Sequence, residues 1–309
     1  MRILITGGAG FIGSHVCEKL VEKGHELIIV DNMSTGIESN VPDNCLLFKM
    51  DIKSRIALQA LLRFTKKIDA VIHLAAQTQV SNSVSNPEED ASENIIGIIN
   101  VLEAMKQFNI PKIIFASSAA VYGNKEQIPI EEYSIPEPTS QYGTSKLSSE
   151  EYIKTYSRLY GIEYCIFRFS NVFGPRQNTD TGGVIAKFLD KIDKNQPIII
   201  YGDGNQTRDF VYVKDVASAI EHSLIKIVTG TYNLSTGTET SINDLSNLMK
   251  EFKDFKIQFK PEQPGDIYKS SLGNKKLICS RWRPSYSLEE ALEETFNYTN
   301  GGNINDKSN

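Results

Sequence analysis

Tyr142 and Lys146 are the residues of this chain whose types and spacing most directly suggest acid–base chemistry. If the segment QYGTSK at 141–146 opens a helix, their side chains lie on one face of it, a turn apart. A free phenol has a pKa of about 10, so acting as a base at neutral pH requires a shift of about three units, or roughly 4 kcal/mol. A neighbouring ammonium supplies about 4 kcal/mol at an effective dielectric constant of about 20. The spacing alone also fits an exposed helix turn without chemistry.

A glycine-rich segment near the start of the chain predicts a dinucleotide site. TGGAGFIG at 6–13 follows an apolar run and contains Gly7, Gly10 and Gly13. Glycines permit a tight turn and a close approach of the backbone to a ligand, and the start of the next helix offers free N–H groups to a pyrophosphate. A second apolar run ends at Asp31, where a carboxylate can hold a ribose diol and repel a 2′-phosphate. We therefore predict NAD rather than NADP, although Asp31 also fits an ordinary turn.

These residues need a scaffold, and the first half of the chain alternates short β-branched runs with helical periodicity. The predicted strands are 2–6, 26–30, 69–75, 112–118 and 163–169, and the predicted helices are 12–23, 88–107 and 141–160. This alternation predicts a Rossmann-like, doubly wound parallel α/β sheet, which binds ligands at the carboxyl ends of its strands. The ends of two further apolar runs, at 51–52 and 74–76, could then line the dinucleotide groove.

After residue 171 the regular alternation of strands and helices ends, and the sequence predicts loops and shorter elements. We expect an NAD-binding domain over 1–170 and a smaller C-terminal substrate-binding lobe over 171–300. Segments at about 214–235 can return to the large sheet. The polar stretch at 301–309 is expected to be a disordered tail.

Composition favours small-molecule chemistry. The net charge of −5 leaves no polybasic face for nucleic acid or an anionic membrane, and no apolar stretch is long enough to span one. With no secretory pattern after Met1, we expect a cytoplasmic protein. The four scattered cysteines predict buried reduced thiols and no metal site; they are Cys17, Cys45, Cys165 and Cys279.

Taken in order, the motifs resemble the extended short-chain dehydrogenase/reductase superfamily, and within it the NAD-dependent epimerase/dehydratase family of UDP-glucose 4-epimerase type. The motifs that carry the resemblance are TGGAGFIG at 6–13, Asp31–Asn32, HLAAQ at 73–77, SSAAVYG at 117–123, Tyr142 with Lys146, and YGDGNQTRDFVYV at 201–213. The resemblance extends from residue 2 to about residue 295.

This resemblance implies a set of cofactor residues. Phe11 and Ile12 would present their backbone to the pyrophosphate. The residues implied around the adenosine are Asp31, Asn32, Ser34, Thr35, Gly36, Asp51 and Ile52. Those implied around the nicotinamide half are Leu74, Ala75, Ala76, Gln77, Asn94, Tyr142, Lys146 and Phe169. Phe169 stands where a tyrosine is common, so one hydrogen bond to the cofactor is expected to be missing.

The resemblance also implies a mechanism and a substrate. Tyr142 would take the proton of a sugar 4-hydroxyl, bridged by Ser118, while the C4 hydride passes to NAD. The resulting 4-keto sugar would turn over and be reduced on its other face, which inverts the stereocentre. The residues implied to bind the UDP-sugar are Ser118, Tyr142, Asn171, Gly183, Val184, Tyr201, Arg208, Asp266 and Ser270.

Two positions, Ser270 and Gln263, bear on which sugar and which nucleotide are bound. In the family, a large tyrosine at the position of Ser270 accompanies plain hexoses, and a small side chain accompanies N-acetylated ones. We therefore expect UDP-GlcNAc and UDP-GalNAc to be accepted, together with UDP-glucose and UDP-galactose, although Ser270 also fits a solvent-facing loop serine. Gln263 replaces the arginine usual three residues before Asp266, which puts diphosphate affinity or nucleotide identity in doubt.

Other functions share this scaffold. Related 4,6-dehydratases and sugar-acid decarboxylases carry an acidic residue where this chain has Ala119 and Ala120. An NAD-dependent keto-reductase, or an epimerase of another nucleotide sugar such as UDP-glucuronate, uses the same catalytic residues and stays an alternative. A non-catalytic NAD-binding protein is disfavoured by the retained Ser118, Tyr142 and Lys146. Helices 88–107 and 141–160 match the pair through which relatives form a homodimer, but they also fit simple packing on the sheet.

Overall fold

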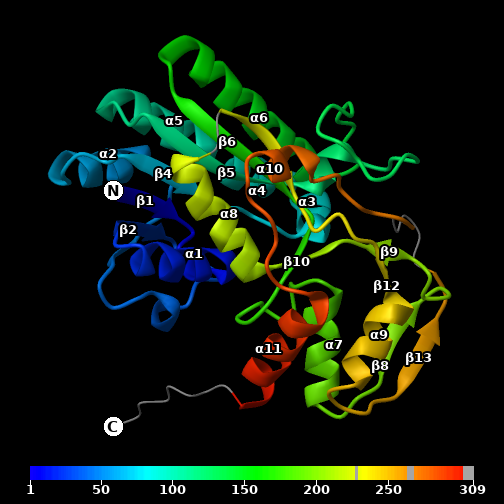
Figure 1. The fold of residues 1–309 in the computed structure, drawn as a ribbon. Coiled ribbons are helices and arrows are strands. Elements are labelled where there is room, and N and C mark those ends of the chain that lie inside the picture. Colours follow the sequence, from blue (N-terminus) through cyan, green and yellow to red (C-terminus); the bar gives the residue numbers. More distant parts are fainter. Residues whose placement is uncertain (227–228, 263–267, 302–309) are drawn as a thin grey trace, which may run out of the picture.

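A seven-stranded sheet organises the protein, whose structure is a computed structural model that describes residues 1–226, 229–262 and 268–301 (Figure 1). The strands in spatial order are β11 (Gly230–Leu234), β6 (Glu163–Phe169), β5 (Lys112–Ser118), β4 (Ala70–His73), β1 (Arg2–Thr6), β2 (Glu26–Asp31) and β3 (Leu46–Lys49). Every pairing in this sheet is parallel. The predicted Rossmann-like α/β fold is therefore confirmed.

Helices cover both faces of this sheet, which is why its strands read as nearly continuous apolar runs. Helices α1 (Phe11–Glu22) and α8 (Val213–Ile225) lie on one face, and α2 (Arg55–Phe64), α5 (Gly97–Phe108) and α6 (Gln141–Tyr160) on the other (Figure 1). Alternate residues of β1 enter different cores: Ile3 and Ile5 pack on the α1 side, and Leu4 packs on the α2 side.

A smaller lobe follows β6 and has a core of its own, in which Phe188 and Leu245 are buried. Its elements are β7 (Asn171–Phe173), α7 (Val184–Asp193), β8 (Ile198–Tyr201), β9 (Thr207–Arg208), β10 (Phe210–Tyr212), β12 (Thr240–Ser241), α9 (Ile242–Lys250), β13 (Ile257–Lys260) and α11 (Leu288–Gly301). Figure 1 shows this lobe below and to the right of the large sheet, with α11 in red.

Helix α8 and strand β11 join the large sheet after the smaller lobe has begun. Helix α8 packs along α1, and β11 pairs with β6 at the edge of the sheet. Helix α10 (Lys275–Cys279) also contributes to the core on this face. A single domain boundary at residue 170 therefore stays a proposal, because the chain passes between the two lobes more than once. The tail at 302–309 lies outside the described residues.

One predicted helix is interrupted. The segment expected to be helical over 88–107 forms α4 (Pro87–Ala91), a π-helical turn η2 (Ser92–Ile96) and then α5. The wider turn leaves Asn94 buried toward the sheet. Three short elements complete the chain: η1 (Glu38–Asn40), α3 (Val80–Ser85) and η3 (Ala119–Tyr122).

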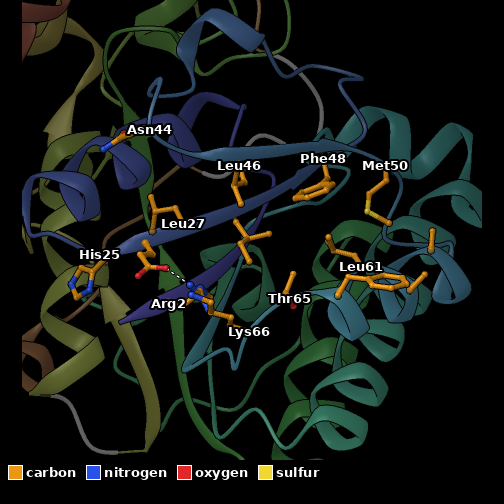
Figure 2. Close-up of a pocket in the computed structure, with 15 residues that line it drawn as sticks. Arg2, His25, Leu27, Asn44, Leu46, Phe48, Met50, Leu61, Thr65 and Lys66 are labelled. Carbon is orange, nitrogen blue, oxygen red and sulfur yellow. Dashed lines mark hydrogen bonds and ion pairs between the residues drawn. The ribbon is translucent and has the colours of Figure 1, made fainter.

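A pocket of about 880 Å³ lies between β2, β3 and α2 (Figure 2). Its wall is mainly apolar, with Leu46 and Phe48 on the edge strand, and it also includes the ion pair of Arg2 and Glu26. Strand β5, which carries Ser118, is separated from it by β4, β1 and β2. The pocket is therefore not the predicted active site.

The sequence also makes predictions about membrane-spanning helices, metal-binding groups and the state of the cysteines. Within the described residues, no helix has the length and apolarity to cross a membrane, and no group of His, Cys, Asp or Glu side chains could hold a metal ion. The cysteines are free thiols, but Cys279 is exposed, so the expectation that all four are buried is wrong.

Candidate active site

The loop between β1 and α1 is shaped for a close approach by a ligand. Gly7 has φ +74°, and a Cβ on it would lie 2.6 Å from the backbone nitrogen of Ala75. A Cβ on Gly13 would lie 2.0 Å from the carbonyl oxygen of Gly7. Gly10 is the N-cap of α1 and provides no side-chain hydrogen bond. The N–H groups of the first turn, which begins at Phe11, are therefore not bound by a capping side chain. This cradle fits a pyrophosphate.

Asp31, at the carboxyl end of β2, fits the ribose of NAD. Its side chain is 7% exposed and accepts hydrogen bonds from the backbone nitrogens of Ala9 (3.0 Å) and Met33 (2.9 Å). The following segment folds over the carboxylate, since a Cβ on Gly36 would lie 2.7 Å from Asp31 Oδ1. Because each carboxylate oxygen has a further lone pair, the site retains capacity for a ribose hydroxyl.

The other adenosine residues gather at the same edge. The side chain of Asn32 accepts a hydrogen bond from Ser34 N (3.0 Å), and the exposed Ser34 and Thr35 continue this turn. Beyond β3, Asp51 accepts a hydrogen bond from Lys53 N (2.8 Å), and the buried side chain of Ile52 packs beneath α5. Their roles toward adenine remain a proposal.

The nicotinamide segment follows β4. Leu74 N donates to Thr6 O (3.0 Å), which ties the segment to β1, and Ala75 and Ala76 follow it beside the glycine loop. Gln77 N donates to Asn94 Oδ1 (3.0 Å), while Asn94 Nδ2 donates to Gln77 O (3.1 Å). Asn94 thus fixes the backbone of this segment.

Phe169 ends β6 on the same side of the sheet, 7% exposed and stacked on Phe167 with ring centroids 6.4 Å apart. The phenyl ring packs into the core and carries no hydroxyl. The bond to the cofactor itself remains a prediction.

The start of α6 brings the three candidate catalytic residues together. Ser140 caps the helix by accepting a hydrogen bond from Gly143 N (3.1 Å), and Tyr142 N donates to Ser83 Oγ (3.1 Å). At the end of β5, Ser118 Oγ accepts a hydrogen bond from Ala120 N (3.2 Å). Ser118 lies close enough to the Tyr142 phenol to lower the pKa of that phenol, so the end of β5 and the start of α6 meet here.

Lys146 lies one turn further along α6, 4% exposed, with its Nζ donating to Ala116 O (3.0 Å). The Nζ is 5.9 Å from the ring centroid of Tyr142. Burial lowers the pKa of Lys146 to about 8, and burial raises the pKa of Tyr142 to about 12, against a lowering by the Ser118 hydrogen bond. The lysine alone therefore does not make the phenol a base at neutral pH, because desolvation outweighs it.

A buried ion pair that the sequence analysis missed holds α6 in place. Arg168 of β6 donates from Nε to Glu150 Oε1 (2.9 Å) and from Nη2 to Oε2 (2.6 Å), and Ser117 Oγ donates to Glu150 Oε1 (2.6 Å). Both charged side chains are at most 3% exposed. The one signal in the sequence is an arginine inside the apolar strand EYCIFRF, which needs a buried partner.

Three candidate substrate residues lie close to the segment 207–209 of the smaller lobe. Asn171 donates from its side-chain amide to Asp209 O (3.2 Å), and Arg208 Nη1 donates to Thr207 O (2.8 Å). Ser270 N donates to the same carbonyl of Thr207 (3.2 Å), so the segment containing Ser270 runs along the strand of Arg208.

The remaining substrate candidates are more widely spaced. Gly183 caps the start of α7 and Val184 is its first residue, while Tyr201 ends β8 and its carbonyl accepts a hydrogen bond from Gln206 Nε2 (2.7 Å). Asp266 and Gln263 lie outside the described residues, so their expected roles at the ribose and diphosphate stay predictions.

Comparison with known proteins gives consistent results. The sequence profile of the NAD dependent epimerase/dehydratase family matches residues 3–235. A protein of Methanocaldococcus jannaschii, named provisionally as a UDP-glucose 4-epimerase, is 46% identical over an alignment of 309 positions that covers 97% of this chain and 99% of that protein.

Solved structures agree over nearly the whole length. A Thermotoga maritima UDP-glucose 4-epimerase with UDP-glucose has a TM-score of 0.92 and 38% identity, covering 96% of this chain and 98% of its own. A UDP-N-acetylglucosamine 4-epimerase from Methanobrevibacter ruminantium, in complex with UDP-N-acetylmuramic acid, has a TM-score of 0.91 and 35% identity, covering 96% and 97%.

Proposed function

The chain belongs to the NAD dependent epimerase/dehydratase family and is an NAD-dependent UDP-sugar 4-epimerase in type, and we propose that it interconverts UDP-GlcNAc with UDP-GalNAc as well as UDP-glucose with UDP-galactose. The observation that supports this proposal is the placement of Tyr142 in the first turn of α6, beside Ser118 at the end of β5 and with the buried Lys146 Nζ 5.9 Å from its ring centroid. A hydroxyl, a phenol and an ammonium in this order suit proton removal from a sugar alcohol.

The chain's own residues divide the work as follows. The glycine loop at 6–13 and Asp31 would hold NAD, which when bound supplies a hydride acceptor with a positively charged ring. Tyr142 would take the proton from the sugar 4-hydroxyl and later return it to the oxygen at C4. Ser118 would bridge the two oxygens, and Lys146 would favour the charged phenolate.

Inversion requires the sugar to turn while the nucleotide stays bound. Arg208, on strand β9 of the smaller lobe, supports this proposal, because a guanidinium with several donors suits the diphosphate. Asn171, fixed by its bond to Asp209 O, would lie between phosphate and sugar.

The choice of sugar rests on Ser270. Its backbone is held against Thr207, beside Arg208, and its partly buried side chain is small. A serine here leaves space for an acetamido group at C2 of the sugar, whereas a tyrosine would fill it. This supports acceptance of N-acetylated substrates together with plain hexoses.

The direct test incubates purified protein with UDP-GlcNAc or UDP-glucose, without added cofactor, and separates the C4 epimers chromatographically. We expect both to be converted. Ser270→Tyr should lose turnover of UDP-GlcNAc and keep that of UDP-glucose. Lys269→Tyr, which adds the same ring at the exposed neighbouring position, should keep both.

Three outcomes would contradict the proposal. If the unaltered protein converted UDP-glucose alone, the role given to Ser270 in sugar choice would be wrong. A requirement for one equivalent of NADH for each sugar would indicate the keto-reductase alternative, because an epimerase regenerates its oxidised cofactor in every cycle. Conversion of UDP-glucuronate with neither of the two substrates would indicate an epimerase of that sugar.

We also propose that the protein is a homodimer through α5 and α6. The outer side of α6 exposes large apolar side chains, with Tyr152 at 41% and Leu159 at 66%. Light scattering after size exclusion should give a dimer for the unaltered protein and a monomer for Leu159→Glu. Ile225→Glu, on the opposite face of the sheet and 69% exposed, should remain dimeric. A dimer in both variants would place the contact elsewhere.

A further inference from the structure

Asp90 is a buried carboxylate that the catalytic scheme above does not use. It lies in α4, just before the π-helical turn, and is 1% exposed. Its Oδ1 accepts hydrogen bonds from Gln77 Nε2 (2.9 Å) and Asn94 Nδ2 (3.1 Å). Within the part of the chain that the structure describes, no cation comes within 4.0 Å of it. A buried carboxylate held only by neutral amides is unusual and calls for a counter-charge.

Lys146 is a buried cation without a carboxylate partner in the described part of the chain. Lys146 is also buried, and its Nζ contacts a carbonyl oxygen and the ring faces of Phe115 (5.1 Å) and Tyr142 rather than a carboxylate. Burial lowers the pKa of Lys146, and the charge of Asp90 raises it. The same charge adds to the raised pKa of Tyr142. Asp90 therefore acts electrostatically on both members of the catalytic pair.

A chain of hydrogen bonds also connects Asp90 to the catalytic helix. The side-chain nitrogen of Asn94 also lies within hydrogen-bond distance of Ser145 Oγ (3.0 Å), so its two N–H groups are shared among Gln77 O, Asp90 Oδ1 and Ser145 Oγ. Ser145, between the two catalytic residues in sequence, donates in turn to Tyr142 O (3.0 Å). Asn94 further accepts a hydrogen bond at its backbone oxygen from Ser149 Oγ (3.0 Å). The carboxylate, the end of β4 and the first turns of α6 are thus one connected unit.

Other titratable groups around Lys146 do not provide the counter-charge. His73 of β4 is buried and its pKa is lowered to about 3, by burial first and then by the charge of Lys146, so it is neutral. Glu150, one turn along α6, is engaged by Arg168. Strand β5 contributes only the Phe115 ring and the Ala116 carbonyl. Asp90 is the remaining carboxylate whose field reaches the ammonium.

We propose that Asp90 is a positioning residue for epimerisation, a buried counter-charge that keeps Lys146 in its ammonium form and fixes it relative to Tyr142 through Asn94 and Ser145. This role rests on the proposed function, since the ammonium matters only if Tyr142 is the base. A negative charge raises the pKa of its neighbours, so its removal lowers the pKa of both catalytic groups.

The test compares Asp90→Asn with Glu88→Gln, which removes the same charge from an exposed position of the same short helix. The pH dependence of kcat should be bell-shaped, with an acid limb from Tyr142 and an alkaline limb from Lys146. In Asp90→Asn both limbs should move toward acid by about one unit, and in Glu88→Gln neither should move. A purely structural role for Asp90 would lower kcat while leaving both limbs in place, which would overturn the proposal.

A second measurement does not depend on turnover. In full-length protein with ¹³Cε-labelled lysine, the NMR signal of Lys146 is assigned by its loss in Lys146→Met and titrated with pH. Its pKa should fall by about one unit in Asp90→Asn, and an unchanged value would refute the role of Asp90. If Asp90→Asn does not fold, the shorter Asp90→Ser takes its place. If the unaltered protein epimerises neither UDP-sugar, the proposed function fails, while this titration still decides whether Asp90 supports the charge of Lys146.

Discussion

Stripping NAD from the protein should leave Tyr142 protonated up to a pH of about 9. In the protein alone, burial raises the pKa of this phenol to about 12. A base that is half ionised near neutral pH therefore needs a pKa lower by about five units, which corresponds to about 7 kcal/mol. This free energy is roughly twice the 4 kcal/mol that a solvated phenol would need, because burial raises the starting pKa.

Lys146 supplies only part of this stabilisation of the phenolate. Its Nζ lies 5.9 Å from the phenol ring centroid. A unit charge at that distance contributes about 3 kcal/mol at an effective dielectric constant of about 20, or about two pKa units. The remaining roughly 4 kcal/mol equals the effect of one more positive charge at about 4 Å, which the oxidised nicotinamide ring carries. Moreover, the pKa of Lys146 is itself lowered to about 8, so without NAD the ammonium is lost before the phenol ionises.

Ultraviolet difference titration of tyrosinate measures this directly, with Tyr142→Phe subtracted to isolate one phenol among 13 tyrosines. The stripped protein should show no Tyr142 signal up to a pH of about 9, and the protein reloaded with oxidised NAD should show one near neutrality. A Tyr142 signal near neutral pH in the stripped protein would refute the reasoning, because the phenol would then be a base without the cofactor.

The same coupling must appear in binding. A ligand that lowers the pKa of a group binds the deprotonated form more tightly by the same factor. The affinity for oxidised NAD should therefore rise with pH by up to about tenfold per unit between the loaded and stripped pKa values of the phenol. The affinity for reduced NAD, whose ring is neutral, should show no such rise with pH. In Tyr142→Phe, the part of the rise for oxidised NAD that comes from the phenol should be lost. Equal pH dependence for both redox forms would contradict the account.

Three further predictions follow from particular contacts. Tyr142→Phe should keep NAD bound but slow epimerisation by about a thousand-fold, measured by NMR of the sugar anomeric protons. Gly13→Ala places a Cβ 2.0 Å from a backbone oxygen of the same loop, so it should purify without NAD while circular dichroism shows a native fold; co-purified NAD would contradict this. Glu150→Gln leaves the Arg168 guanidinium buried without its counter-charge and should lower the free energy of unfolding by about 3–5 kcal/mol in urea titration. The control Glu151→Gln removes an exposed carboxylate and should change it by less than about 1 kcal/mol.

Much of the scaffold is predictable from local pattern. The strands at 2–6, 112–118 and 163–169 and the helix at 141–160 occur with the expected bounds. Each has a strong periodicity or a marked cap, and the parallel order follows from the alternation of strands and helices. The contact of Ser118 with Tyr142 follows in turn, because the end of one strand and the start of the next helix meet at the same edge.

What local pattern does not predict is the environment of the charges. The π-helical turn at 92–96 interrupts a sequence whose periodicity reads as one continuous helix, and it determines that Asn94 faces inward. Asp90 reads as one of three acidic residues on an exposed first turn, yet tertiary packing buries it. The direction of the Tyr142 pKa shift was likewise missed, because the sequence supplies the lysine but not the degree of desolvation.

The charge arithmetic also explains how one residue can serve both halves of an epimerisation. With oxidised NAD bound, a positive ring would lower the pKa of Tyr142 so that the phenol could act as a base, and with the neutral reduced form that pKa would return toward the high value set by burial. The phenol would then give its proton back to the oxygen at C4. No second acid or base is required, which suits a segment with Ala119 and Ala120 beside Ser118, where related dehydratases and decarboxylases need an acidic side chain. The same burial that opposes ionisation in the protein alone is thus what makes the proton transfer reversible.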